Sequence, residues 1–148
     1  LSTVGEGARL LMADPREFQA FLKEYEAASR ENPVLGLKDN LLNIILRQNN
    51  SNHFGGCTGY GCGAAFNFVA LLPDGEVHAC RKLPSLIGNF NRQTLHEIYH
   101  SPEAERYRQG CQECSACHLR LVCGGCLAVT HGWGRDPFKE RDPDCFMT

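Results

Sequence analysis

The chain has 148 residues, of which 43% are hydrophobic and 22% are charged, and its formal net charge is −2. This length suits one ordinary domain with a small extension, and the composition is typical of a globular protein. The small net charge gives no electrostatic reason to expect a nucleic acid or an acidic membrane as a partner, and no apolar run is long enough to span a bilayer.

Nine cysteines are the unusual feature of the composition. Residues 1–15 (LSTVGEGARLLMADP) lack the basic start and the long apolar stretch of a signal peptide. They also lack an initiator methionine, so we expect a piece of a longer chain. The odd number of cysteines and the missing export signal both disfavour a secreted disulfide framework. We therefore expect a cytoplasmic protein whose cysteines bind metal.

Two helices are predicted before the first cysteine. The first spans residues 14–33, with Asp14 as its N-cap, Pro15 in its first turn and Pro33 at its end. The second lies within residues 35–50. Because two helices form only a thin core, we expect both to pack on something else, such as another domain. Their predicted apolar faces consist of Phe18, Phe21, Leu22 and Tyr25 in the first helix and Leu37, Leu41, Ile44 and Ile45 in the second.

A β-hairpin is predicted after a loop that is rich in asparagine, serine and glycine and holds Cys57 and Cys62. In residues 66–80 (FNFVALLPDGEVHAC), a Pro-Asp-Gly turn joins an aromatic and aliphatic strand to a short second strand. The hairpin would return Cys80, at the end of the second strand, toward Cys62. This proximity is the first indication of a shared metal site.

Short helices and loops are predicted for the rest of the chain. Two short helices fit residues 91–110, with Ser101 and Pro102 starting the second and Gly110 ending it. Residues 127–145 are predicted to be a tail broken by glycine and proline. The whole pattern predicts an α+β fold, in which a small cysteine-rich domain with a β-hairpin and short helices follows a two-helix lead-in.

The spacing of the cysteines distinguishes between kinds of metal site. A zinc ribbon needs two CxxC pairs separated by roughly fifteen residues. Here the gap between Cys117 and Cys123 is five residues, and a single zinc ion would leave the distant cysteines unexplained. Iron–sulfur clusters accept thiolates from both closely spaced and distant positions, and eight ligands would fill two [4Fe–4S] clusters. The full spacing is Cys57-x4-Cys62, Cys80, Cys111-x2-Cys114-x2-Cys117-x5-Cys123-x2-Cys126 and Cys145.

This order of residues resembles the SPASM domain, the C-terminal auxiliary-cluster domain of many radical S-adenosylmethionine (SAM) enzymes. The resemblance implies that residues 53–148 form this domain and that residues 1–52 lead into it from a catalytic barrel elsewhere in the same full-length chain. The family usually has three residues before the last cysteine of the middle run, where the CGGC of this chain has two. The residues that carry the resemblance are Cys62, Gly75, Cys80, Cys114, Cys117, Cys123, Cys126 and Cys145.

The resemblance also implies a set of ligands for each cluster. Cluster I would use Cys57, Cys62, Cys80 and Cys126, and cluster II would use Cys114, Cys117, Cys123 and Cys145. Cys111 has no counterpart in the family pattern. We expect it to be a free thiol, with replacement of a neighbouring ligand in a damaged cluster as the alternative. Gly124 and Gly125 are expected to let the backbone turn near sulfur and to direct N–H groups at it.

Catalysis is not expected from this chain alone. A radical SAM enzyme needs a CxxxCxxC loop, and no three cysteines here have that spacing. The resemblance implies a complete enzyme that modifies a ribosomally made peptide or protein, with SAM bound only by the radical SAM domain and electrons relayed by the two auxiliary clusters. The alternative is a peptide- or protein-binding module that zinc or a single iron stabilises, without a redox role.

Overall fold

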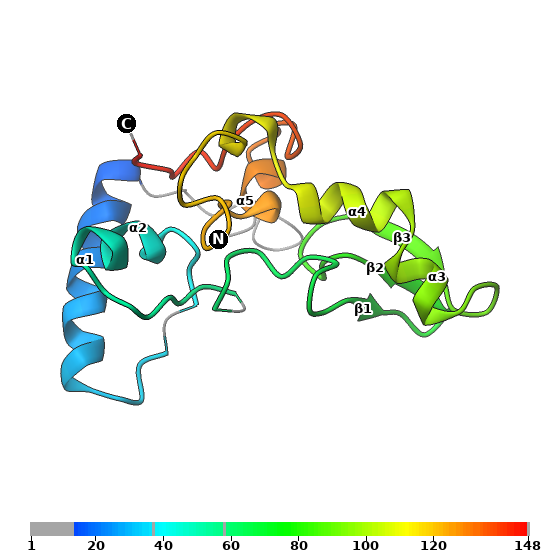
Figure 1. Ribbon diagram of the computed structural model, residues 1–148, viewed down its shortest axis with the longest axis horizontal. Helices are drawn as coiled ribbons and strands as arrows, with labels where there is room; N and C mark the ends of the chain where they lie inside the picture. Colours follow the sequence, from blue (N-terminus) through cyan, green and yellow to red (C-terminus); the bar gives the residue numbers. More distant parts are fainter. Residues whose placement is uncertain (1–13, 37, 58, 148) are drawn as a thin grey trace.

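The computed structural model describes residues 14–36, 38–57 and 59–147 (Figure 1). Helices and a small antiparallel sheet occur together, which confirms the predicted α+β class. The elements are α1 (Pro15–Glu31), α2 (Leu42–Gln48), β1 (Ala70–Leu71), β2 (Glu76–His78), β3 (Leu86–Asn89), α3 (Leu95–Tyr99), α4 (Pro102–Gln109), the 3-10 helix η2 (Gln112–Cys114) and α5 (Leu127–Gly132).

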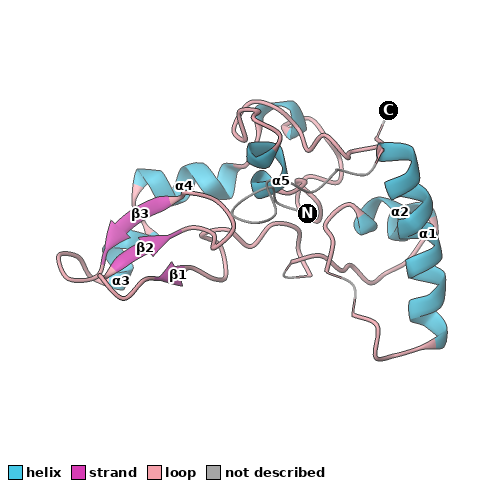
Figure 2. Cartoon of the chain, turned by 180° about the vertical axis from the view of Figure 1, so that it is seen from behind, coloured by secondary structure: helices cyan, strands magenta, loops and turns pink. Residues whose placement is uncertain are grey.

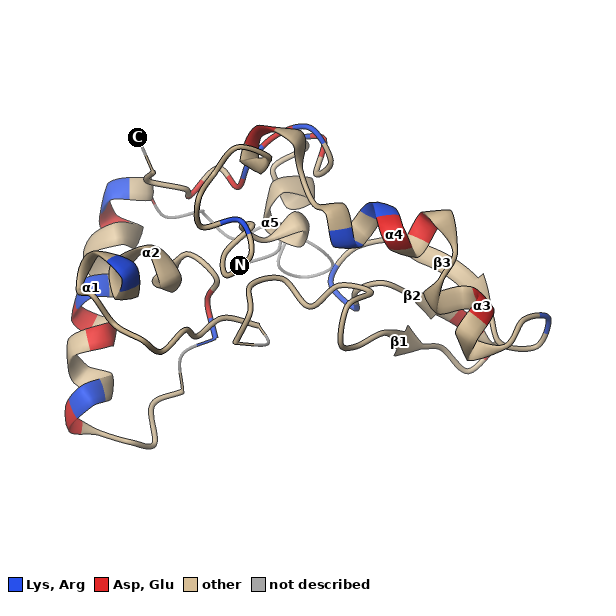
Figure 3. Cartoon of the chain, viewed as in Figure 1, with Lys and Arg blue, Asp and Glu red and all other residues tan. Residues whose placement is uncertain are grey.

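The elements form an elongated molecule with the cysteine-rich loops in its middle. Figures 1 and 2 show α1 and α2 at one end, and the sheet with α3 and α4 at the other. The loops that carry most of the cysteines lie between these two ends, next to α5. Acidic and basic residues are interspersed along α1 and α4 (Figure 3). Within the described ranges, no helix has both the length and the apolar character needed to cross a membrane.

Helix α1 begins and ends as its sequence predicts. The side chain of Asp14 accepts a hydrogen bond from the backbone N–H of Arg16 at 2.8 Å, and the helix ends at Glu31, just before Asn32. The predicted apolar face is wrong in one position, because the side chain of Phe21 is 54% exposed. It lies at the edge of the stripe that buries Leu22, and its ring stacks on those of its aromatic neighbours in the helix.

Helix α2 is shorter than predicted, with seven residues. The carboxylate of Asp39 accepts the backbone N–H of Leu41 at 2.9 Å, which favours a turn ahead of the helix. Leu37, a predicted member of the apolar stripe, lies outside the described residues. The expected packing partner of the two helices proves to be the cysteine-rich region itself. Their common core contains Leu22, Leu41, Leu42, Ile44, Ile45, Leu119 and Cys123.

The predicted hairpin is present and extends into a three-stranded sheet in the order β1-β2-β3. Ala70 pairs with His78 across the turn, and Gly75 has a φ of 86°, as the Pro-Asp-Gly turn requires. The first strand is shorter than predicted because residues 65–67 form a turn, in which the N–H groups of Phe66 and Asn67 donate to the carbonyl of Gly63 at 3.0 and 3.3 Å. Strand β3, which the sequence reasoning missed, pairs antiparallel with β2.

The short helices follow their capping signals. Thr94 and Glu97 form a capping box at the start of α3, Ser101 caps α4, and Gly110 ends α4 with a φ of 64°. The prediction that residues 127–145 form only a broken tail is wrong for the first six, which are α5. This helix forms because Leu127 and Ala128 pack against Leu83, a tertiary contact that local sequence does not reveal. The boundary predicted at residue 52 stays a prediction.

Candidate metal centres

Three other cysteines lie near Cys62, so that four cysteines from three separate segments come together. Burial raises the pKa of the Cys62 thiol to about 12, and the nearby thiols of Cys126, Cys80 and Cys57 add to the rise. Cys57 is exposed, whereas the other three are half-buried. The structure thus brings together the residues predicted for cluster I, which we call group I: Cys57, Cys62, Cys80 and Cys126.

A second group of four lies on the side of the cysteine-rich region that faces α2. Burial raises the pKa of Cys123 to about 12, and the neighbouring Cys145 and Cys117 contribute to the rise. Burial raises the pKa of the Cys114 thiol, Cys111 adds to the rise, and Cys145 and Cys123 contribute further. A narrow cavity of about 20 Å³ is lined by all four of these cysteines, together with Ile44 and Leu119 among others. We call the four cysteines that were predicted for cluster II group II: Cys114, Cys117, Cys123 and Cys145.

Hydrogen bonds from the lead-in fix the loops that carry these cysteines. Asn40 accepts the backbone N–H of Cys57 at 2.9 Å and donates to the carbonyl of Gly125 at 2.6 Å. One side chain thereby ties a group I loop to the glycine pair that follows Cys123. The buried carboxylate of Asp142 accepts the N–H of Cys126 at 2.8 Å, and burial raises the pKa of this carboxyl to about 6.

Asn43, in α2, also hydrogen-bonds to loops next to cysteines of both groups. Its side chain is fully buried, accepts the backbone N–H of Gly55 at 2.7 Å and donates to the Gly55 carbonyl at 3.1 Å. It also donates to the carbonyl of Val122, beside Cys123. Sequence reasoning missed both asparagines. A signal was present for Asn43, because it interrupts the apolar run LLNIIL, and a polar side chain buried there needs partners.

Backbone N–H groups approach the sulfur atoms of both groups. The N–H of Lys82 donates to Cys80 Sγ at 3.4 Å. Four further N–H groups, each two residues after a cysteine, counteract the rise in the pKa of that cysteine: Ala64 for Cys62, Gly125 for Cys123, Ala128 for Cys126 and Met147 for Cys145. Such donors stabilise thiolate sulfur and help to set the reduction potential of iron–sulfur clusters. The donor set therefore fits clusters at both groups. Of the two glycines that were expected to direct N–H groups at sulfur, Gly125 acts on the pKa of Cys123.

A metal that binds at either group would have to displace protons from the thiols. A ligating cysteine must be a thiolate, and the raised pKa values keep the metal-free thiols protonated at neutral pH. Metal binding would therefore release protons. Two basic side chains partly offset the increase in thiol pKa: Lys82 acts on Cys126, and Arg141 acts on Cys145.

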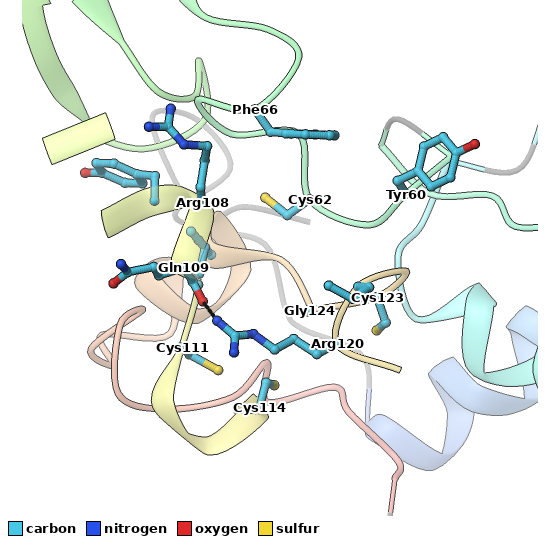
Figure 4. Close-up of a pocket in the computed structure, with 14 residues that line it drawn as sticks. Tyr60, Cys62, Phe66, Arg108, Gln109, Cys111, Cys114, Arg120, Cys123 and Gly124 are labelled. Carbon is cyan, nitrogen blue, oxygen red and sulfur yellow. Dashed lines mark hydrogen bonds between the residues drawn. The ribbon is translucent and has the colours of Figure 1, made fainter. Parts of the chain in front are cut away.

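A larger cavity of about 480 Å³ lies between the two groups (Figure 4). Cys62 of group I and Cys114 and Cys123 of group II line it. The guanidinium of Arg120 extends across this space and donates to the carbonyl of Gln109, at the end of α4, at 2.6 Å. The cavity thus connects the two candidate centres.

The side chains are not arranged as a single-ion site. Among the described residues, no three histidine, cysteine, aspartate or glutamate side chains are positioned to hold one metal ion. His78 instead accepts the N–H of Ser85 through Nδ1 at 3.2 Å, and its Nε2 lies 3.0 Å from Glu76. Which sulfur atoms bind iron stays a prediction.

Comparison with known proteins agrees with the resemblance noted in the sequence. Residues 62–118 match the model of the SPASM family, described as an iron–sulfur cluster-binding domain. The predicted family is confirmed for this segment, which includes Cys62, Cys80, Cys114 and Cys117. The searches of curated proteins and of solved structures gave no match.

Proposed function

We propose, on the premise that this chain carries a SPASM iron–sulfur cluster-binding domain, that it binds two [4Fe–4S] clusters, one at each cysteine group. The observation that carries this proposal is the convergence of the cysteines into two sets of four. Each set draws on segments far apart in the sequence, and their N–H donors suit thiolate ligands.

The surrounding residues would hold the clusters and shield them from water. At group II, the apolar side chains of Ile44, Leu119 and Phe146 pack around the cysteines, and at group I the thiols pack against Leu83 and Leu127. When bound, such clusters supply one-electron oxidation and reduction. Because four thiols are available at each group, no iron needs a ligand from a substrate, which favours electron relay over direct substrate activation.

We further propose that the chain is part of a cytoplasmic radical SAM maturase that modifies a ribosomally made peptide or protein. The SPASM match supports a radical SAM context. The cysteines of this chain lack the CxxxCxxC spacing, so SAM would be bound by a barrel domain of the same full-length protein. The auxiliary clusters would relay an electron released by the substrate during its modification.

The metal content tests the first proposal. After anaerobic purification and reconstitution with iron and sulfide, we expect about eight irons and eight sulfides per chain. The double variant Cys62→Ala/Cys80→Ala should lose half of the iron, Cys117→Ala/Cys145→Ala the other half, and the control Cys111→Ala none. Stoichiometric zinc in a colourless protein, or one iron in a red protein, would instead support the interaction module.

The relay role needs the full-length enzyme. We expect Cys114→Ala/Cys117→Ala to lose cluster II, seen as the loss of its reduced-state EPR signal, and to lose most of its turnover. Normal turnover without cluster II would refute the relay while leaving cluster binding intact.

A further inference from the structure

Cys111 is the cysteine that neither group includes. Its side chain is buried, with 4% exposure, and lines the large cavity between the two groups. Figure 4 shows it beside Cys114, beneath the side chain of Arg120. Cys111 and Cys114 line this cavity together, and Cys111 adds to the rise in the pKa of the Cys114 thiol that burial causes. The ninth cysteine is a free thiol, as expected, and it lies beside a predicted ligand.

The local backbone explains this contact. Cys111 immediately precedes the 3-10 helix η2, whose last residue is Cys114. With three residues per turn, side chains at positions i and i+3 of such a helix lie one above the other. The C-terminal region holds the turn in place, because the N–H of Gln112 donates to the carbonyl of Phe138 at 2.9 Å, and the N–H of Glu113 to that of Lys139 at 3.1 Å.

The position of Cys111 differs from that of a ligand. The narrow cavity of group II is lined by all four of that group's cysteines and not by Cys111. The wider cavity is lined by both Cys111 and Cys114. Cys111 therefore lies beside Cys114 but outside the narrow cavity that the four group II cysteines line.

We propose that Cys111 is a positioning residue for cluster II, which donates its S–H hydrogen bond to the sulfur of Cys114. This inference rests on the proposed binding of a cluster at group II. A ligating Cys114 carries no proton, so the non-ligating thiol supplies the donor. A hydrogen bond to a cluster sulfur stabilises the more negative, reduced state and therefore raises the reduction potential.

The sign of the effect gives a direct test with Cys111→Ala and Cys111→Ser in the anaerobically reconstituted chain. The alanine variant lacks the donor, so one of the two cluster potentials should fall while the other stays unchanged. A hydrogen bond of ordinary strength corresponds to up to about a tenfold change in the ratio of reduced to oxidised cluster, or about 59 mV for one electron. The serine variant keeps a donor and should restore most of the potential. Ser115→Ala, which removes an exposed hydroxyl from the same segment, is the matched control and should change neither potential.

The possible outcomes separate this inference from the proposed function. If the unmodified chain takes up no iron–sulfur cluster, the proposed function fails first. If it takes up about eight irons and Cys111→Ala loses about four of them, Cys111 is a ligand and the positioning role is wrong. Unchanged potentials in Cys111→Ala, or an equal fall in the serine variant, would also overturn it. Because Cys111→Ser is close in size to cysteine, its potential and EPR spectrum remain informative even if the alanine variant folds poorly.

Discussion

Replacing Asn43 with alanine tests whether α2 holds the cysteine-bearing loops in place. The Asn43 side chain is fully buried and makes three hydrogen bonds, two to the backbone of Gly55 and one to the carbonyl of Val122. Gly55 is two residues before Cys57 of group I, and Val122 directly precedes Cys123 of group II. The variant would therefore release both loops at once.

The expected cost follows from these contacts. Each hydrogen bond contributes about 1 kcal/mol, and more where a buried partner is left unsatisfied, so Asn43→Ala should lose roughly 3–5 kcal/mol. For a chain of this size, each kcal/mol lowers the unfolding midpoint by about 2–4 °C, so we expect a fall of roughly 6–20 °C. Asn49→Ala is the matched control. Asn49 ends the same helix, is exposed and makes only a 3.4 Å side-chain contact with Glu26, so its replacement should have little effect.

The assay is thermal unfolding of the cluster-loaded chain under anaerobic conditions, followed by circular dichroism. Loss of iron makes the transition irreversible, so all variants must be compared at one scan rate. Loss of the cluster absorbance should accompany unfolding in Asn43→Ala. A midpoint within about 2 °C of the Asn49→Ala control would refute the idea that these hydrogen bonds hold the loops, given the lower limit derived above.

Two further variants test close backbone contacts and capping. A Cβ at Gly61 would lie 2.6 Å from the carbonyl oxygen of Cys123, and its φ is +80°, so Gly61→Ala should cost roughly 2–5 kcal/mol and lower the iron content. Gly134→Ala, with a φ of +72° and no atom within 4 Å of the added Cβ, should cost only the backbone strain of about 1–2 kcal/mol, and equal unfolding midpoints would contradict this argument. Thr94→Ala removes the N-cap of α3 and should destabilise the fold by about 1 kcal/mol in thermal unfolding, with no loss of iron. A fall in iron content would mean that α3 supports the cluster sites. Hydrogen bonds from Thr94 lower the pKa of Glu97. The Glu97 carboxylate therefore stabilises the fold at neutral pH, and this stabilisation is lost as the pH falls below the ordinary glutamate pKa of about 4.3. Thr94→Ala should weaken this pH dependence of the unfolding midpoint.

Those parts of the fold that depend on local rules were predictable from the sequence. Asp14 with Pro15, and Ser101 with Pro102, start helices because a side-chain acceptor and a fixed φ act within one turn. The Pro-Asp-Gly hairpin also follows from local backbone preferences. Beyond these, the cysteine spacing indicated two groups of four, because a known family carries the same order.

The remaining features depend on contacts between distant segments. Strand β3 is stabilised by pairing with β2. Helix α5 is stabilised because Leu127 packs against Leu83, which lies 44 positions earlier in the chain. Asn40 gave no signal of its own, since it lies in a polar stretch, and only the fold shows that it joins Cys57 to Gly125. A single sequence does not reveal such pairs, because side-chain partners are chosen by tertiary packing.

The run of cysteines from 111 to 126 shows how local and tertiary effects divide between two sites. The three-residue spacing of Cys111, Cys114 and Cys117 suits the tight turns of this segment, which keep their side chains on one side, toward group II. Directly after Cys123, Gly124 and Gly125 take positive φ values of 66° and 64°, a backbone conformation that glycine adopts readily and other residues rarely adopt. A side chain at Gly125 would also meet Asp142 at 2.7 Å. The two glycines therefore explain how Cys126, only three residues beyond a group II cysteine, joins Cys62 in group I.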